Sequence, residues 1–404
     1  MPSKNRSFFK NRRGAPVFAA GCACLFLAGC GHQPGGIEKI TENGAEVVLN
    51  HLEPYRVPGR FSSPTLQEIM AVDTENDSVA KAGVTDIYLF DVDSQGNIYI
   101  MVPPTHPGNF VFKLSPEGKP LLSFGPMGQG PFELEYPSGL HIDAMDRVWT
   151  LESPKKKYHI YDTSGKPLAE GIPEGGFEDL VQLENGTFLV SRMEKSDLKE
   201  KFLAIAICIH GQDFRIRREI DRFTKAPNRA IFEQVAEKYV CGTNFVFLAK
   251  PAAGRIFVGN SDRGYEILVF DLEGKLLRKI RKQYSPVPVS EDYRKKTLEV
   301  YKKNGMPEYA AKIFFPENWH PFQSFLADDE GRLLVMTYES GGSPGEFIFD
   351  VFDQDGVFKS RLSLSVVAPT YDNISARIRG NRLYVVQEKP GGFKRLTVYQ
   401  MIWR

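Results

Sequence analysis

Histidine and cysteine are the residues of this chain best suited to binding a metal or to acid, base and nucleophile chemistry. The sequence holds seven histidines and five cysteines. No two histidines have the His-x-x-x-His or His-Glu-x-x-His spacing, so the sequence contains no local zinc motif. His141 and Asp143 could still meet a third ligand from another part of the fold, with packing inside a strand as the alternative explanation for His141.

A run of aromatic and proline residues late in the chain is a second candidate site. It reads Phe314-Phe315-Pro316-Glu317-Asn318-Trp319-His320-Pro321-Phe322. Exposed aromatic rings provide a stacking platform for a sugar, a peptide or a partner protein, whereas buried rings pack a core. Both explanations remain open for this run. The candidate binding residues are Phe315, Trp319, His320 and Phe322, together with His141.

The first thirty residues have the order of an export signal. Five basic residues precede an uncharged run over 15–29 that is rich in Ala, Phe and Leu. The run is about fifteen residues long, shorter than the roughly 20 that a membrane-spanning helix needs. We therefore expect residues 1–29 to be a signal peptide that is removed.

Cys30 follows Leu27-Ala28-Gly29 directly. This arrangement resembles the lipobox of bacterial lipoproteins, in which the cysteine thiol takes a diacylglycerol and becomes the new N-terminus. The resemblance implies that Cys30 is lipidated, that acyl chains hold the protein on a membrane, and that residues 30–44 are a flexible tether. Gly31 at the next position, rather than Asp, fits sorting to the outer membrane of a host with two membranes.

Charge and the remaining cysteines limit the partners. The leader holds five of the 51 basic residues and none of the 50 acidic ones, so the mature chain has a formal charge of −4. A chain without a basic surplus is not expected to bind nucleic acid or, apart from its lipid, anionic membranes. Cys208 and Cys241 could pair in an oxidising compartment or remain two separate buried thiols, and their spacing does not decide between these.

A repeated pattern runs through the body of the chain. Each copy has a polar turn, usually with Gly, followed by an apolar run, which is typical of a hairpin turn that leads into a strand. Six copies occur, at 93–100, 143–150, 183–190, 252–258, 328–335 and 379–385. A second strand–turn–strand pattern follows four of them, at 111–121, 160–168, 269–277 and 351–358. Each unit thus supplies about four short strands, the content of one propeller blade.

The sequence therefore predicts an all-β protein, a six-bladed β-propeller over residues 45–404. The sixth unit ends at Arg404 without room for a fourth strand, so we expect the strand at 45–49 to pair with the last blade and close the ring. Ser290 followed by two acids predicts a helix start, and Asn304-Gly305 predicts its end. A small helical insertion is thus expected at about 290–315.

The segments 125–133 and 137–143 resemble the linker between blades of NHL-type propellers, with a Gly-rich turn, Phe132, Pro137 and then the turn and strand of the repeat. The whole mature chain further resembles bacterial six-bladed propeller lipoproteins. That resemblance implies the architecture and the anchor, but no activity. Related amidating lyases and lactonases hold metals in the central channel, and their ligands have no residue-by-residue match here.

The expected function is a membrane-anchored binding or scaffolding module of the cell envelope, for a protein, a peptide or a glycan. The alternative is a lyase or hydrolase with a metal in the central channel, and an extracellular sensor is a third possibility. No cofactor is predicted besides the lipid on Cys30. Three or more His, Asp or Glu side chains converging from different blades would favour an enzyme, whereas an apolar or aromatic face would favour a binding module.

Overall fold

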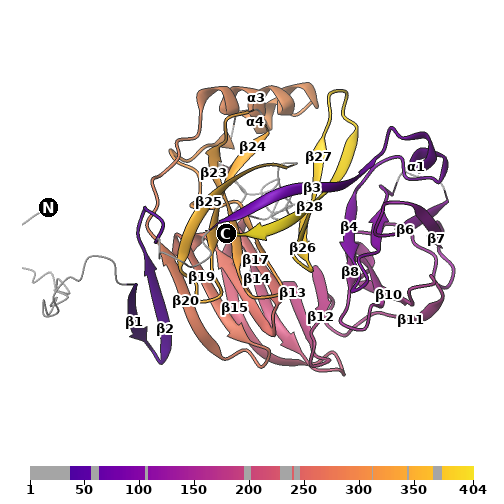
Figure 1. Ribbon diagram of the computed structural model, residues 1–404, viewed down its shortest axis with the longest axis horizontal. Helices are drawn as coiled ribbons and strands as arrows, with labels where there is room; N and C mark the ends of the chain where they lie inside the picture. Colours follow the sequence, from indigo (N-terminus) through magenta and orange to yellow (C-terminus); the bar gives the residue numbers. More distant parts are fainter. Residues whose placement is uncertain are drawn as a thin grey trace, which may run out of the picture. The chain divides into compact units, whose positions relative to one another are not determined.

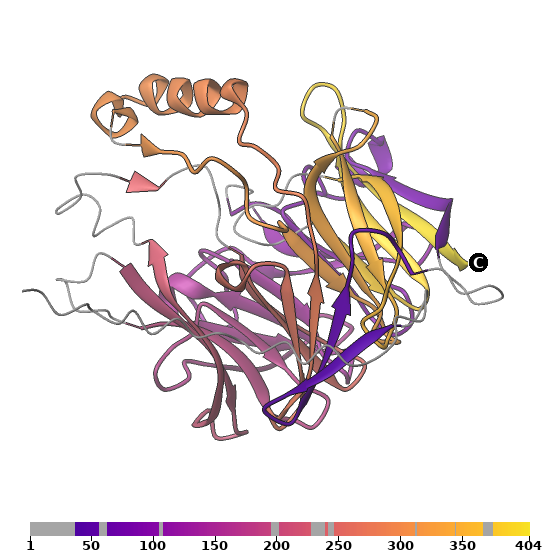
Figure 2. The same cartoon turned by 90° about the vertical axis from the view of Figure 1, so that its left-hand side faces the viewer.

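The computed structural model describes residues 37–55, 63–104, 108–194, 202–227, 239–240, 246–311, 313–343, 345–366 and 375–404. In this part of the chain, six sheets, each built on four antiparallel strands, form a six-bladed β-propeller (Figures 1 and 2), which confirms the predicted fold class. Blade one contains β4 (Leu89–Val92), β5 (Ile98–Met101), β6 (Asn109–Leu114) and β7 (Pro120–Pro126). Blade two contains β8 (Gly139–Ile142), β9 (Val148–Glu152), β10 (Lys157–Tyr161) and β11 (Pro167–Gly171).

Blades three to six follow the same plan. Blade three contains β12 (Asp179–Gln182), β13 (Phe188–Glu194), β14 (Phe202–His210) and β15 (Ile216–Pro227). Blade four contains β17 (Phe247–Ala252), β18 (Arg255–Asn260), β19 (Glu266–Asp271) and β20 (Leu276–Lys282). Blade five contains β22 (Ser324–Ala327), β23 (Leu333–Ser340), β24 (Glu346–Phe352) and β25 (Phe358–Ser365). Blade six contains β26 (Ala376–Arg379), β27 (Arg382–Glu388), β28 (Lys394–Trp403) and β3 (Pro64–Asp73).

The repeated turn joins the first and second strands of each blade, and an aspartate fixes it in three of them. Asp93 Oδ1 accepts hydrogen bonds from the backbone N–H groups of Gln95 (3.0 Å) and Asn97 (2.8 Å). Asp143 and Asp328 do the same in blades two and five. A short carboxylate that bonds to its own backbone stabilises a tight turn, which explains the position of these residues in the repeat.

Apolar side chains fill the space between neighbouring blades. One cluster of buried residues lies at each of the six interfaces within the described part of the chain. Phe90 and Tyr384 belong to the cluster between blades one and six, and Phe257 and Phe325 to that between blades four and five. Because each blade is covered on both faces by its neighbours, its strands are continuously apolar where they are buried. The ring of interfaces positions the first strands around a common axis.

An N-terminal strand closes the ring, but not the strand that the sequence led us to expect. β3 supplies the fourth strand of blade six and pairs antiparallel with β28 (Figure 1). The segment 45–49 instead lies in β2 (Ala45–Asn50), which pairs in parallel with β20 of blade four. Val47 and Val48 are both fully buried there. Alternating apolar residues predict a strand, but they do not distinguish between two blades that both offer an edge.

Two further segments extend the sheets. β1 (Glu38–Glu42) pairs with β2 and makes the sheet of blade four six-stranded. It lies within the predicted tether 30–44, so the last part of that segment belongs to a sheet. A short helix α1 (Asp77–Lys81) follows β3, and the two-stranded sheet of β16 (Tyr239–Val240) and β21 (Ile313–Phe314) is parallel.

The expected helical insertion lies between blades four and five. It contains α3 (Glu291–Lys303) and α4 (Pro307–Ala310), and Figure 2 shows α3 outside the blades. Ser290 Oγ accepts a hydrogen bond from the backbone N–H of Tyr293 (3.2 Å), which is the predicted N-cap. No residue of α3 is fully buried. The helix rests on the propeller through one half-buried side only.

Candidate functional site

The first strands of five blades place ionisable side chains next to the propeller axis. We call this set the axial arc. In the order of the blades around the ring, it consists of Arg377 (β26), Asp91 (β4), His141 (β8), Asp179 (β12) and Lys250 (β17). These residues come from five consecutive blades, six, one, two, three and four. Solvent reaches the arc, because the side chains of Asp179 and Arg377 are 53% and 22% exposed.

The members of the axial arc are linked to one another. Arg377 Nε lies 3.7 Å from Asp91 Oδ1, and Asp91 Oδ2 accepts a hydrogen bond from the backbone N–H of Ile142 (2.8 Å). Next to Ile142, the ring of His141 contacts Asp179 Oδ1 through Nε2 at 2.8 Å. An ionised carboxylate only accepts hydrogen bonds, so this contact places a proton on Nε2 of His141.

Charge keeps Asp179 ionised inside the ring. Desolvation acts to raise the pKa of Asp179, but His141 and Lys250 outweigh it and hold this pKa well below its usual range. The backbone N–H of Leu180 adds a hydrogen bond to Oδ1 at 3.0 Å. Asp179 therefore presents a fixed negative charge to solvent.

Four of the five members of the arc escaped the sequence analysis, which singled out only His141. A signal for them exists: Asp91 and His141 each stand two residues before the aspartate that fixes the repeated turn. Arg377 likewise stands two residues before the last residue of β26. This offset, rather than any local motif, would have found Asp91 and Arg377, whereas Asp179 stands farther from Leu183 at the turn of blade three and does not share it.

The aromatic residues of the insertion form a separate cluster. The Trp319 ring stacks on Tyr338 of β23 with centroids 4.5 Å apart, and the ring of Tyr293 from α3 meets it edge-on at 4.7 Å. Phe315 lies 6.4 Å from Tyr293, also edge-on. Trp319 thus joins the insertion to blade five, and one face of its ring is already covered.

The two remaining candidates of this run have different surroundings. Phe322 is fully buried in the core between blades four and five, where its ring lies 5.5 Å from that of Tyr265. His320 is half-buried, and desolvation lowers its pKa. His141 belongs to the axial arc and not to this cluster. The binding role of all five candidates stays a prediction.

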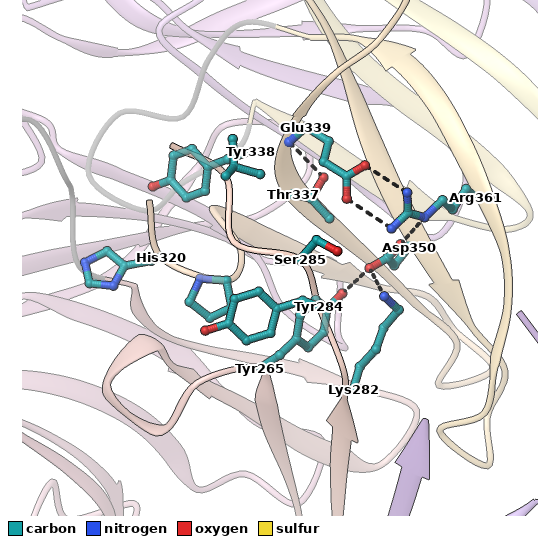
Figure 3. Close-up of a pocket in the computed structure, with 12 residues that line it drawn as sticks. Tyr265, Lys282, Tyr284, Ser285, His320, Thr337, Tyr338, Glu339, Asp350 and Arg361 are labelled. Atoms are coloured by element: carbon teal, nitrogen blue, oxygen red, sulfur yellow. Dashed lines mark hydrogen bonds and ion pairs between the residues drawn. The ribbon is translucent and has the colours of Figure 1, made fainter. Parts of the chain in front are cut away.

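A buried charge cluster lies beneath the insertion, between blades four and five (Figure 3). Asp350 is its centre: it accepts a hydrogen bond from the Tyr265 hydroxyl (2.8 Å) and lies 3.3 Å from Lys282 Nζ and 3.1 Å from Arg361 Nε. Arg361 also makes two hydrogen bonds to Glu339, at 2.8 and 3.0 Å. The cluster satisfies the charges that these two blades bury together.

The surroundings of Lys282 do not form a ligand site. Its side chain is fully buried, and desolvation lowers the pKa of its amine although Asp350 acts in the opposite direction. The adjoining cavity, which His320 and Tyr338 also line, measures about 10 Å³. Such a volume holds at most one water molecule. We assign this cluster a structural role.

A second buried cluster holds the Gly-rich linker between blades one and two. The ring of His159 is fully buried, with Nε2 3.1 Å from Glu152 and Nδ1 3.1 Å from Glu170. Glu152 accepts hydrogen bonds from two linker N–H groups, those of Glu135 and Tyr136, each at 2.8 Å. Despite desolvation, His159 and these N–H groups lower the pKa of Glu152 to about 2. The linker is thus tied to blade two by ionised carboxylates.

Cysteine chemistry in the described residues is confined to Cys208. Its thiol is free and buried on β14, and burial raises its pKa to about 11. Cys241, its possible partner, lies outside the described residues, as do the lipidation candidate Cys30 and the histidines His32 and His106. A buried thiol of raised pKa is a poor nucleophile, so Cys208 acts as a small apolar residue.

Two features are absent from the described residues. They contain no group of three or more His, Cys, Asp or Glu side chains arranged to hold a metal ion. They also contain no helix with the length and apolar character needed to span a membrane.

Comparison with known proteins gives similarity to solved structures at low sequence identity. No family model and no curated protein matches the chain. A protein of Bacteroides fragilis NCTC 9343 whose name describes it as exported has 11% identity and a TM-score of 0.49, covering 88% of this chain and 99% of that one. A gluconolactonase from Xanthomonas campestris has 13% identity and a TM-score of 0.36, covering 83% and 100%. A streptogramin B lyase has 10% identity and a TM-score of 0.33, covering 85% and 98%. Similarity at this level does not extend to activity.

Proposed function

We propose that this chain is an exported lipoprotein of the cell envelope whose propeller binds a protein, peptide or glycan partner at its axis. The observation that carries the binding role is the axial arc, in which five consecutive blades fix ionisable side chains within reach of solvent. Side chains that are held in place before a ligand arrives lose little freedom on binding.

The chemistry of the arc supports binding. Asp91 accepts hydrogen bonds from the backbone N–H groups of Val92 (2.9 Å) and Ile142 (2.8 Å), and Asp179 accepts them from His141 and Leu180. Both carboxylates are thus anchored by protein donors and stand beside cations. A polar partner would meet a rigid surface that carries charges of both signs, which favours specific recognition.

The anchor and location follow from the leader. The basic start, the uncharged run over 15–29 and Cys30 after Leu-Ala-Gly support export and lipidation, and Gly31 supports outer-membrane sorting. Acyl chains on Cys30 would hold the propeller at the membrane surface, since two or more chains give stable anchoring. Anchoring at the membrane then keeps the propeller close to possible partners in the cell envelope.

Binding can be tested on the soluble Cys30→Ser protein. Purified protein is titrated with envelope proteins, peptides and glycans by calorimetry, and the best partner is retested with Arg377→Gln and His141→Asn. Arg217→Gln is the matched control, because Arg217 is 64% exposed near the start of β15. We expect the arc variants to bind about tenfold more weakly or worse, and the control to bind as tightly as the parent. A partner that binds the arc variants as tightly as the parent contradicts the proposal.

A lyase or hydrolase is the second candidate, and one contact favours it. A carboxylate that orients an imidazole, as Asp179 does for His141, is the arrangement of a general base. Elemental analysis of the purified protein decides between the two: stoichiometric zinc or calcium would favour the enzyme. Turnover abolished by His141→Asn would assign the base.

A further inference from the structure

The axial arc carries opposite charges on opposite sides of the propeller axis. Asp179 belongs to blade three and Arg377 to blade six. In a closed ring of six blades, the third and the sixth face each other across the axis. A ligand at the axis therefore meets a carboxylate on one side and a guanidinium on the other.

Arg377 keeps hydrogen-bond donors for a ligand. Its Nη1 donates to the carbonyl of Ala376 at 2.9 Å, whereas the 3.7 Å separation from Asp91 is too long for a hydrogen bond. The guanidinium lies 5.8 Å from the ring centroid of Phe90, whose buried ring limits its movement. A guanidinium has five N–H donors in a planar fork that fits a carboxylate.

Asp179 keeps an acceptor for a ligand. Both of its hydrogen bonds, from His141 and Leu180, are made by Oδ1. Its side chain is 53% exposed, against 22% for Arg377. His141 and Leu180 leave Oδ2 to accept a hydrogen bond from a ligand's ammonium group, for which a fixed carboxylate is a natural partner.

The arc presents charges of both signs to a ligand. Arg377 and Lys250 are cations and Asp91 and Asp179 are carboxylates, so a ligand that carries both a carboxylate and an ammonium group can pair with each sign. We infer that the axial arc binds a zwitterion, with the ligand's carboxylate at Arg377 and its ammonium at Asp179. Amino acids and short peptides with free termini share this chemistry.

This inference rests on the proposed binding at the axis and specifies its ligand. The probes are glycine, diglycine, triglycine and tetraglycine, which separate the two charges by a further ~3.5 Å per residue. Each is compared with its N-acetylated form, which lacks the ammonium, and its C-amidated form, which lacks the carboxylate. Binding to the full mature chain with Cys30→Ser is measured by calorimetry at neutral pH.

The zwitterions should bind best at one chain length, and either cap should weaken that binding by about tenfold or more. In Arg377→Gln, amidation should have no further effect, and in Asp179→Asn, acetylation should have none, because each cap and its variant remove the same contact. Arg377→Lys keeps the charge but not the planar fork of donors, so its affinity for the zwitterion should lie between those of the parent and Arg377→Gln.

Asp213→Asn and Arg217→Gln are the matched controls. Asp213 in the β14–β15 turn and Arg217 near the start of β15 form an exposed ion pair, 3.7 Å apart, and both variants should bind as the parent does. If capped peptides bind at the arc as tightly as free ones, the inference of a zwitterionic ligand is overturned, while the proposed binding function stands. No binding by any free peptide would also overturn it, and the partner titration would then test the binding function separately.

Discussion

Asn50 and Phe358, 308 residues apart in sequence, are joined by a hydrogen bond from the backbone N–H of Phe358 to Asn50 Oδ1 (2.8 Å). The side-chain N–H₂ of Asn50 donates to the carbonyls of Gly356 (3.0 Å) and Arg281 (3.1 Å). Asn50 is the last residue of β2, which lies on blade four, whereas Phe358 begins the outer strand of blade five. One buried side chain thus ties the N-terminal segment to two blades.

Asn50→Ala should lower the free energy of unfolding by about 2 kcal/mol, because it leaves three buried backbone groups without a partner. Asn50→Asp should cost at least as much, since it keeps the acceptor but faces two carbonyl oxygens without a donor. The measurement is chemical denaturation. Asn109→Ala is the control. The side chain of Asn109 donates a hydrogen bond to the exposed Ser123 hydroxyl, and this variant should change the free energy of unfolding by no more than about 0.5 kcal/mol.

Ring closure by β3 can be tested with two shortened chains. A chain that begins at Ser63 retains β3, and we expect it to fold as a monomer. Its midpoint of thermal unfolding should be lower than that of the full mature chain, because β1, β2 and Asn50 are missing. A chain that begins at Glu75 lacks β3 and exposes the edge of β28, so it should aggregate or unfold. Size-exclusion chromatography and thermal unfolding report both outcomes. Equal midpoints and a monomeric state for both chains would contradict closure by β3.

Acid stability should depend on Glu152. Its pKa is about 2 in the folded protein against 4.5 when unperturbed, so the folded state binds its proton less readily than the unfolded state. The stabilisation is therefore complete above pH 4.5 and is lost as the pH falls toward 2. The difference between 4.5 and about 2 corresponds to about 3 kcal/mol, at about 1.4 kcal/mol for each pKa unit.

Glu152→Gln should accordingly destabilise the protein at pH 7 and flatten the loss of stability between pH 5 and about pH 2. Unfolding free energies at a series of pH values measure both effects. Glu184→Gln, at an exposed position of the blade-three turn, is the control and should keep the parent's profile. A steep profile retained in Glu152→Gln would show that other carboxylates govern acid unfolding.

The cluster around Asp350 should be sensitive to loss of its central charge. Asp350→Asn leaves the buried Lys282 without its counter-charge and should cost about 3–5 kcal/mol. Lys282→Met should cost less, because Asp350 keeps Tyr265 and Arg361 as partners. Asp292→Asn, which removes an exposed ion pair on α3, should change stability by less than about 1 kcal/mol. Equal costs for Asp350→Asn and Asp292→Asn would rule out the structural role.

Cys30→Ser should release the protein from membranes, because a serine cannot form the thioether to diacylglycerol. Fractionation of cells into membrane and soluble material measures this. Cys22→Ser is the control: Cys22 lies in the uncharged run of the leader, and its loss should leave the protein with the membranes. A Cys30→Ser protein that stays in the membrane fraction would show that the lipid assignment is wrong.

Local patterns were sufficient to predict the blades. The side chains of the turn residues Asp93, Asp143 and Asp328 accept hydrogen bonds from backbone N–H groups of the same turn. Each turn is therefore specified by four or five consecutive residues. The insertion was predictable for the same reason, since the Ser290 cap acts within one turn of α3. Six copies of a local signal indicated six blades.

Pairings between distant segments were not predictable from such signals. The segment 45–49 was correctly taken as a strand, but its partner is β20 and not the last blade. The choice depends on which edge buries Val47 and Val48 and on the hydrogen bonds of Asn50, all of which involve residues more than 200 positions away. Strand propensity contains no information about such partners.

The sequence by itself determined the repeat, the turns, the insertion and the signal-like leader, because each depends on neighbouring residues. Only the tertiary structure decided which strand closes the ring and which side chains share the axis. Asp91, His141, Asp179 and Arg377 stand in four different blades, and their local sequence does not show which of them lie together. Closure of the ring brings them together, since contacts across an axis are set by the geometry of the whole fold.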